Sequence, residues 1–339
     1  MKMTLSHRFL NVNLDILHSL GFEKTKALDV LNFDPARLDN FSDRMSLDPF
    51  VDCLNAAAEA TSDPNIALRL GYKFRVGTFG QTGSIYAYCE NLKDVILMND
   101  RYQKIAIDAG RAEYNVNSNG RHHMCFLPYF SDTERYRPIT DMIMASYVTT
   151  YRWLSWGSGE RILSACLPYA EPEDNHFHNE IFQSEIHYES KKCRLEFSEN
   201  SMTQTITTYD PERLTKAQIK LDKILGLQMA AQSFERAITA AIRGAIDSGH
   251  VSSETVAQRL GMNTSTLRAK LNESPEGMRQ RLDRMRKTMF IEKHAKGQSF
   301  SEIAIGLAYN DQAAMNRAFS RWFGMTPSEW RRQQAEVID

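Results

Sequence analysis

Side chains able to hydrogen-bond to nucleic acid bases lie close together around residue 268 of this 339-residue chain. The guanidinium of Arg268 can donate to O6 and N7 of guanine together, a contact that discriminates against other bases by about 1–3 kcal/mol. Ser265 can bond a base edge or a phosphate, and the ammonium of Lys270 suits a phosphate. Leu267 and Leu271 form the apolar side of the same predicted helix. The side chains left facing outward are those of Ser265, Arg268, Ala269 and Asn272.

The residues before this helix predict the element that would hold it in place. Val256, Ala257 and Leu260 form the inward face of a preceding helix. Gly261 suits the left-handed residue that ends a helix, and Asn263 can cap the next one. Two short helices joined by a turn with glycine are typical of a helix-turn-helix, whose second helix lies in a DNA major groove.

A second pattern of the same kind follows 48 residues later, counted from Leu267 to Met315. A basic helix predicted over 278–295 separates the two patterns. The sequence therefore predicts tandem helix-turn-helix units, whose second helices can enter successive major grooves about 34 Å apart. The second pattern consists of inward-facing Ile303, Ala304 and Leu307, a cap at Asn310-Asp311, and anchoring Met315, Phe319 and Trp322.

The last predicted helix runs into a specific order of residues from Arg317 to Arg331, RAFSRWFGMTPSEWR. Gly324 can end the helix, and Pro327 can begin the next one with Thr326 as its cap. The segment contains, in this order, an Arg-x-Phe motif within the helix, a Phe-Gly turn, a Thr-Pro pair and a final aromatic residue followed by arginine. This order resembles the AraC/XylS-type bacterial transcription regulators, and the resemblance covers residues 232–332.

The resemblance also implies which residues meet DNA. The base-facing positions that it implies are Ser265, Arg268 and Ala269 in the first unit and Gln312, Ala313, Asn316 and Arg317 in the second. Gln312 and Asn316 suit adenine, whereas Arg317 suits guanine or a phosphate. We expect backbone contacts from Lys270, Asn272, Arg284 and Arg321.

Two positions depart from the family pattern. Ala308 stands where the family usually has a glycine before an aromatic residue, which would tighten that turn. Ala269 stands where a larger polar side chain is common, which weakens any base-specific role there.

The N-terminal part changes from helical periodicity, including a helix predicted over 92–109, to short alternating runs. An Asn-Gly turn at 117–120 between two such runs is typical of a β-hairpin. Further strands are predicted at 162–167, 185–188 and 194–197. The predicted fold is an α+β domain, a helical layer with a small sheet, followed by an all-α tandem helix-turn-helix domain. The expected domains are an effector-sensing or interaction domain (1–198), a linker helix with a dimer contact (199–231) and a DNA-binding domain (232–334).

The segments 70–71, 77–80 and 176–197 resemble the sensor domain of one branch of the same family, a domain named after arabinose binding. Members of this branch answer to varied small molecules, so the resemblance implies an effector without implying a sugar. The sequence does not identify the effector-binding residues. An aromatic stripe suits a helix core better than a pocket, and three arginines are candidate carboxylate clamps. They are Tyr147, Tyr151, Trp153 and Trp156, and Arg75, Arg101 and Arg152.

Composition and charge exclude several classes of protein. Hydrophobic residues make up 42% and charged residues 24%, which excludes a disordered or collagen-like chain. The chain has no apolar stretch long enough to span a membrane, and its five cysteines form no C-x-x-C pair, so we expect a cytoplasmic protein. The net charge of -1 hides 14 basic against 10 acidic residues after residue 250, and 27 against 32 before it. A basic C-terminal part is compatible with DNA contact.

Motifs typical of enzymes are missing, including G-x-S-x-G, a Walker loop and H-E-x-x-H. We therefore expect no catalytic residue, no cofactor and no metal site. Alkylation-repair enzymes share the predicted C-terminal fold, but they need a reactive cysteine, and Cys125 and Cys166 are predicted to be buried strand residues. The expected partners are double-stranded DNA, a small-molecule effector, a second copy of the chain and RNA polymerase. The alternative is an N-terminal domain that only dimerises or binds a protein partner.

Overall fold

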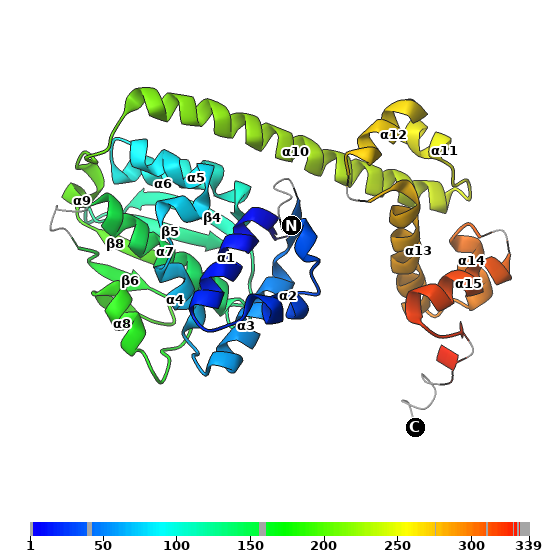
Figure 1. Ribbon diagram of the computed structural model, residues 1–339, viewed down its shortest axis with the longest axis horizontal. Helices are drawn as coiled ribbons and strands as arrows, with labels where there is room; N and C mark the ends of the chain where they lie inside the picture. The colour runs from blue at the N-terminus through cyan, green and yellow to red at the C-terminus, as the bar shows by residue number, and fades with distance from the viewer. Residues whose placement is uncertain are drawn as a thin grey trace. The chain divides into compact units, whose positions relative to one another are not determined.

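The computed structural model divides the chain into two compact units, Met1–Gln228 (unit 1) and Met229–Asp339 (unit 2) (Figure 1). Unit 1 combines helices with two small sheets, and the described part of unit 2 is helical, which confirms the predicted fold class. None of the described helices combines the length and apolarity that crossing a membrane requires. The described residues are 3–38, 43–155, 161–274, 276–309, 311–327, 329–330 and 332.

The larger sheet of unit 1 has the strand order β4-β5-β8-β6-β7, and the smaller one has the order β2-β1-β3. The predicted hairpin is confirmed, because β4 and β5 pair along their whole length across a turn in which Gly120 has a φ of 72°. The β6–β7 pair is parallel. The strands are β1 (Thr4–Ser6), β2 (Arg44–Ser46), β3 (Ile107–Asp108), β4 (Gly110–Val116), β5 (His122–Pro128), β6 (Ser164–Cys166), β7 (Glu185–His187) and β8 (Cys193–Phe197).

Helix α7 is buried along almost its whole length and forms the interior of unit 1. The helix predicted over 92–109 is shorter than expected: α6 ends at Tyr102, and Ile107 pairs with Leu5 in the smaller sheet. Sheet pairing there satisfies the backbone groups that a longer helix would have used. The helices are α1 (His7–Ser19), α2 (Lys24–Val30), α3 (Leu47–Thr61), α4 (Ile66–Tyr72), α5 (Gln81–Ser84), α6 (Leu92–Tyr102), α7 (Arg137–Leu154), α8 (His176–Phe182) and α9 (Glu199–Thr203).

Unit 2 is built around an aromatic cluster centred on Phe290 of α13. Its ring lies 5.1 Å from that of Phe319 and 5.7 Å from that of Phe323, both on α15, and 5.3 Å from that of Phe300 on α14, measured between centroids. Helix α10 begins in unit 1 and ends in unit 2. The helices are α10 (Pro211–Asp247), α11 (Ser253–Arg259), α12 (Thr264–Asn272), α13 (Met278–Ala295), α14 (Phe300–Gly306) and α15 (Gln312–Phe323).

The turns after α11 and α14 share one backbone geometry. Gly261 and Ala308 are both left-handed, with φ of 65° and 55°. In each turn this residue's N–H donates to the carbonyl three positions back, and the next N–H donates to a carbonyl five positions back. Ala308, predicted to tighten its turn, therefore occupies a conformation that costs an L-residue about 1–2 kcal/mol.

The close approach of α4 and α7 yields a test of packing in unit 1. A Cβ on Gly71 would collide with the carbonyl oxygen of Met142, whereas one on Gly77 meets nothing within 4 Å. We expect Gly71→Ala to lower the free energy of unfolding of unit 1 by about 1–3 kcal/mol or more, because the two backbones must separate. The control Gly77→Ala changes it by about 0.5 kcal/mol at most. Amide hydrogen exchange in α4 and α7 measures both, and equal effects would contradict the packing argument.

The two turns of unit 2 yield a matched pair of opposite substitutions. Ala308→Gly is expected to stabilise unit 2 by about 0.5–1 kcal/mol. It relieves the strain of a left-handed L-residue, and the greater conformational entropy of glycine in the unfolded chain offsets part of that gain. Gly261→Ala has open space around it, so its expected cost of about 1 kcal/mol is a backbone effect. Amide hydrogen exchange in α11–α15 tests both changes. Destabilisation by Ala308→Gly would count against the strain.

Candidate functional site

The first helix-turn-helix consists of α11 and α12, each fixed at its start by a side-chain cap. Ser252 Oγ accepts from the Thr255 N–H at 3.1 Å, and Asn263 Oδ1 accepts from the Thr266 N–H at 2.8 Å. Such caps satisfy N–H groups that the first helical turn leaves unpaired. Leu267 is buried on the inner side of α12, as predicted. The helix is thus held with its other side outward.

The outward side of α12 carries the residues that were expected to face DNA. Ser265, Arg268, Ala269, Lys270 and Asn272 are all exposed. Ser265 Oγ donates to Asn263 Oδ1 at 2.7 Å, so this hydroxyl also supports the cap. Arg268 is exposed, and its guanidinium takes part in none of the hydrogen bonds or ion pairs among the described residues, which leaves it available to a ligand.

The second helix-turn-helix consists of α14 and α15. Ser299 and Glu302 form a reciprocal capping box at the start of α14, and the Ser299 N–H bond at 2.8 Å lowers the pKa of Glu302. Asp311 caps α15 by accepting from the Ala314 N–H at 2.6 Å. Asn310, the other predicted cap residue, lies outside the described residues. Met315 and Phe319 are buried, as the pattern predicted.

The outward side of α15 carries the second expected set of base-facing residues. Gln312, Ala313 and Arg317 are exposed, and Asn316 is half-buried. Gln312 Nε2 donates to Asn316 Oδ1 at 3.2 Å, so the two amides are preorganised beside each other. For Arg317, as for Arg268, no polar partner occurs among the residues described. Among the described residues, α12 and α15 therefore each present one guanidinium without a polar partner.

Two of the expected phosphate-contacting arginines are already paired within unit 2. Arg284 bonds Glu276 at 2.8 Å, and Arg321 bonds Asp283 at 2.5 Å and 3.3 Å, a hydrogen bond that raises the pKa of Arg321. All of these groups are partly exposed, so a phosphate could share or displace the carboxylate. The sequence pattern of basic residues did not reveal this pairing, although Glu276 lies eight positions before Arg284.

Other basic residues of α13 bind the ends of neighbouring helices, a role that the sequence analysis did not identify. Arg286 donates to the Leu307 and Ala308 carbonyls, both at 2.9 Å, and Lys287 donates to the Trp322 carbonyl at 2.9 Å. Cations are favourable there because the last carbonyls of a helix lack partners. These contacts fix α14 and α15 against α13.

Arg281 of α13 is buried and holds the start of this helix to α10. Its guanidinium forms a two-pronged pair with Glu235, at 2.5 Å and 2.8 Å, and also donates to the Glu276 carbonyl at 2.9 Å and to Ser274 Oγ. Ser274 and Glu276 follow α12, so this one side chain joins three segments. Arg243 and Glu292 form a second, exposed pair between α10 and α13.

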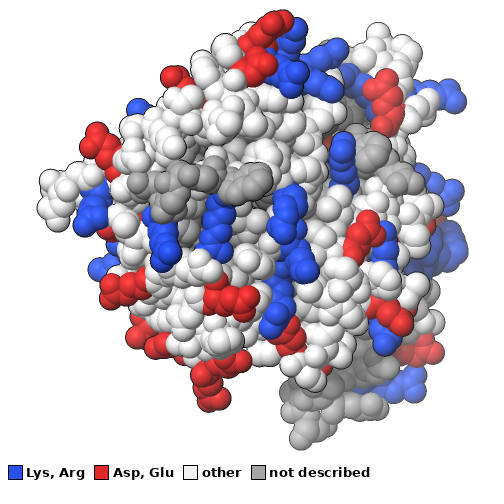
Figure 2. Space-filling model, turned by 60° about the vertical axis from the view of Figure 1, so that its left-hand side comes forward, with Lys and Arg blue, Asp and Glu red and all other residues white. Residues whose placement is uncertain are grey.

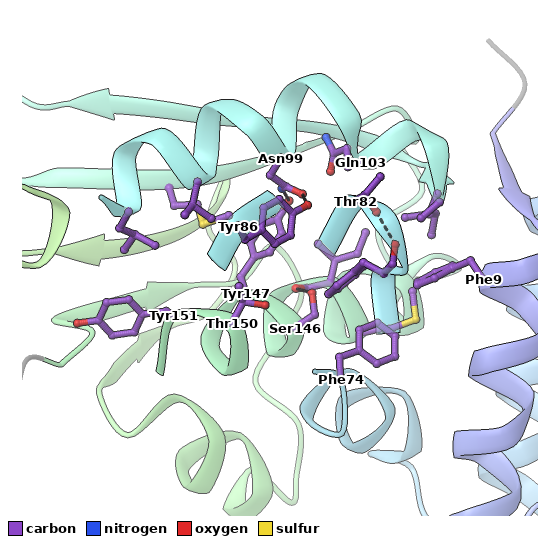
Figure 3. A pocket seen from close by; sticks show the side chains of 18 residues that line it. Phe9, Phe74, Thr82, Tyr86, Asn99, Gln103, Ser146, Tyr147, Thr150 and Tyr151 are labelled. Atoms are coloured by element: carbon purple, nitrogen blue, oxygen red, sulfur yellow. Dashed lines mark hydrogen bonds between the residues drawn. The ribbon is translucent and has the colours of Figure 1, made fainter. Parts of the chain in front are cut away.

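A cavity inside unit 1 is the second candidate site. The space between its lining atoms is about 700 Å³, counting the part open to solvent. Its walls come from α1, α5, α6, α7, β3, β5 and the segments next to them, and none of the described side chains that line it is charged. Figure 3 shows Tyr86, Asn99 and Tyr147 gathered in the middle of the cavity, with Phe74 and Phe9 at one end and Tyr151 at the other.

The aromatic stripe expected to be core contributes to this cavity. Tyr147 and Tyr151 are buried and line it, whereas Trp153 is 43% exposed. Trp156 lies outside the described residues. The three arginines proposed as carboxylate clamps do not line it: their partners are the Tyr72 and Phe74 carbonyls for Arg75, Asp222 for Arg101 and the Ile181 carbonyl for Arg152.

The cysteines and histidines show no reactive arrangement among the residues described. Cys125 and Cys166 are buried strand residues, as predicted, and burial raises the pKa of Cys125. His122 bonds the Tyr114 hydroxyl and His123 bonds Asn115. No cluster of potential metal ligands occurs within the described part of the chain. Figure 2 shows basic and acidic side chains interspersed on the face that it presents.

Comparison with known proteins gives matches over both parts of the chain. Residues 21–206 match the model of the arabinose-binding domain of AraC transcription regulators, and residues 256–333 match a helix-turn-helix domain. The transcriptional regulator VirS of Mycobacterium tuberculosis is 25% identical over 94% of this chain and 93% of its own length. The ornithine utilization regulator of Pseudomonas aeruginosa is 21% identical over the same shares. The crystal structure of CdpR from Pseudomonas aeruginosa covers 91% of this chain and 96% of CdpR, at 18% identity and a TM-score of 0.43.

The arabinose-binding domain model alone covers more than half of the chain, and the helix-turn-helix match follows it in the family's order. The capped helices, their outward polar faces and these matches agree with one another. The chain belongs to the AraC family of DNA-binding transcription regulators.

Proposed function

We propose that this regulator reads two successive major grooves, with α12 in one and α15 in the other, under the control of a small molecule bound in unit 1. The observation that carries the DNA-reading part is the pair of capped helices that each expose an unpaired arginine. Effector sensing is assigned to residues 1–198, DNA binding to 232–334, and a connecting role to 199–231.

The outward side chains suggest which bases are read. Arg268 suits guanine, and the adjacent amides of Gln312 and Asn316 suit adenine. Arg317 suits guanine or a phosphate. Ser265 contacts a base edge or phosphate, and the methyl groups of Ala269 and Ala313 would contact a thymine methyl without further base discrimination.

Backbone contacts would fix the register of the two helices on the duplex. Lys270 and Asn272 flank the outward face of α12 and are exposed. Arg284 and Arg321 are bound to the carboxylates of Glu276 and Asp283 in the free protein. In the complex, a DNA phosphate replaces each carboxylate or binds the guanidinium beside it. Phosphate contacts from these four residues contribute equally to the affinity for every DNA sequence.

Selection of binding sites from a genomic fragment library tests this proposal. The purified protein is incubated at ~150 mM salt, at which nonspecific contacts have weakened, and the retained fragments are sequenced. The proposal expects a site with two short blocks about one helical turn apart. Uniform retention that disappears with added salt, with and without candidate effectors, would contradict it.

Two substitutions separate base reading from backbone binding. Arg268→Ala is expected to relax the preference at one base pair of one block by about 1–3 kcal/mol, and Arg317→Ala to do so in the other block. Arg321→Ala is the matched arginine control, and it is expected to weaken all sequences equally. Site selection repeated with each variant measures the change, and a uniform loss with Arg268→Ala would count against its assignment.

The exposed apolar side chains of α10 favour a second copy of the chain as partner. Ile219 and Leu227 are 66% and 64% exposed and lie eight positions apart, within one stripe of the helix. The alternative function, in which unit 1 serves only as a dimerisation module, rests on the same stripe. Burying two such side chains in a dimer would contribute favourable free energy.

The double substitution Ile219→Ser and Leu227→Ser is expected to raise the dissociation constant of the dimer about tenfold or more, because both apolar contacts are lost. Sedimentation of the full chain over a range of concentrations measures it. The exposed neighbour Lys220→Ser is the control and should leave the constant unchanged. A monomeric wild-type protein, or an unchanged constant, would rule out this stripe as the interface.

A further inference from the structure

We propose that the cavity of unit 1 takes an uncharged, mainly apolar small molecule whose hydrogen-bond acceptor, such as a carbonyl oxygen, is bound by the hydroxyl of Tyr147. This inference rests on the proposed effector control and gives the chemical class of the effector. It places one polar contact in the middle of the cavity, where Tyr86, Asn99 and Tyr147 meet (Figure 3).

The absence of charge in the described lining selects against ionised ligands. The polar side chains of the wall are hydroxyls and amides, such as Thr82, Ser146 and Gln103. A carboxylate or ammonium moved from water into such a site would lose its hydration without gaining an opposite charge, which is strongly unfavourable. An ionised amino acid or organic acid is therefore a poor occupant.

The hydrogen bonds of the wall leave the proton of the Tyr147 hydroxyl available to a ligand. The Tyr86 hydroxyl donates to Asn99 Oδ1 at 2.7 Å, and Asn99 Nδ2 donates to the Tyr147 hydroxyl oxygen at 3.2 Å. Among the described residues the hydrogen bonds of Tyr147 include no acceptor for its own proton. A tyrosine hydroxyl carries one donor, so Tyr147 can offer its proton to an acceptor in the cavity. Burial raises the pKa of Tyr86 and of Tyr147, which keeps both hydroxyls protonated.

Most of the other polar groups in the wall already have partners in the protein. Thr82 Oγ1 donates to the Phe79 carbonyl at 2.6 Å, Ser146 Oγ to the Ile143 carbonyl at 2.6 Å, and Gln103 Nε2 to the Gly110 carbonyl at 3.1 Å. A polyhydroxylated sugar would leave several of its hydroxyls without partners, at a cost for each. The cavity therefore suits a ligand with few polar atoms.

Aromatic rings form the apolar end of the cavity. Phe9 stacks on Phe79 with centroids 6.0 Å apart, and Phe74 meets Phe79 edge-on at 5.4 Å. Such walls favour a planar ring or an apolar chain, because dispersion and apolar burial contribute along the whole contact. Acetophenone, with a ring and one carbonyl, is the simplest probe of this arrangement.

Binding to the full-length protein is measured with ¹³C-methyl-labelled methionine, because Met124 and Met142 line the cavity and Met289 is buried in unit 2. Four probes are compared: acetophenone, ethylbenzene with the same shape but no acceptor, benzoate with a charge, and L-arabinose. Acetophenone is expected to shift the Met124 and Met142 signals saturably, to bind more tightly than ethylbenzene, and to leave Met289 unchanged. Benzoate and L-arabinose are expected not to bind. Equal or tighter binding of benzoate or L-arabinose at these methyls, or no shift with any probe, would overturn the inference.

Two tyrosine variants test the hydroxyl itself. Tyr147→Phe is expected to weaken acetophenone about 2- to 10-fold while leaving ethylbenzene unchanged. Tyr114→Phe is the matched control: Tyr114 does not line the cavity and its hydroxyl bonds His122 Nδ1 at 2.7 Å, so acetophenone affinity should stay the same. Unchanged acetophenone affinity in Tyr147→Phe would overturn the role of this hydroxyl. If that variant does not fold, the ratio of the dissociation constants of acetophenone and ethylbenzene for the wild-type protein shows whether a hydrogen-bond acceptor on the ligand strengthens binding.

Binding to the selected DNA site, measured with and without saturating acetophenone, separates this inference from the proposed function. Binding in the cavity together with a change in DNA affinity supports both. Binding in the cavity with unchanged DNA affinity supports the ligand class and overturns control by such a ligand. Failure of the site selection itself overturns the DNA-reading proposal and leaves the cavity result standing.

Discussion

Helix α13 has to satisfy a buried guanidinium near one end and an aromatic cluster near the other, and the geometry of unit 2 depends on both. Arg281 is buried, so its charge requires the two-pronged pair with Glu235 and the bonds to the segment after α12. Loss of Glu235 would leave this buried charge without its carboxylate, which is unfavourable even though Glu235 itself is 46% exposed. Phe290, nine positions later, packs against rings of α14 and α15. Helix α13 therefore orients both α12 and α15, and neither can turn without disturbing a buried contact.

Unit 1 depends on a different constraint, the close approach of α4 and α7 at Gly71. Helix α7 carries Met142, Ser146 and Tyr147, so its position determines one wall of the cavity. The opposite wall includes Asn99 of α6, and three positions later Tyr102 donates to Asp222 of α10 at 2.8 Å. A ligand that bonds Tyr147 therefore acts close to the contact that holds the first part of α10 within unit 1.

Local features of the chain could be predicted from the sequence, and partners distant in the sequence could not. Periodicity identified Leu267, Met315 and Phe319 as buried because helical spacing alone decides which side faces inward. The cavity was missed because its wall combines Phe9, the 74–88 turns and α7, which only the fold brings together. The ion pair of Arg321 with Asp283 joins two helices, and the spacing of charges along one helix carries no signal for it. The early end of the helix predicted over 92–109 could likewise not be foreseen, because it depends on the pairing of Ile107 with Leu5, which is distant in the sequence.

Hydrogen bonds and ion pairs between basic residues of unit 2 and other groups of the protein affect how strongly DNA affinity depends on ionic strength. Each phosphate that a protein neutralises releases counterions and adds about 0.9 to the slope of log affinity against log salt. Residues 251–339 contain 14 lysines and arginines, but among the described residues three that are assigned no phosphate contact bind a carboxylate or carbonyls of the protein itself. The salt dependence of DNA binding should therefore be shallower than the charge count implies, which leaves specific base contacts a larger share of the affinity in concentrated electrolyte. The three residues are Arg281, Arg286 and Lys287.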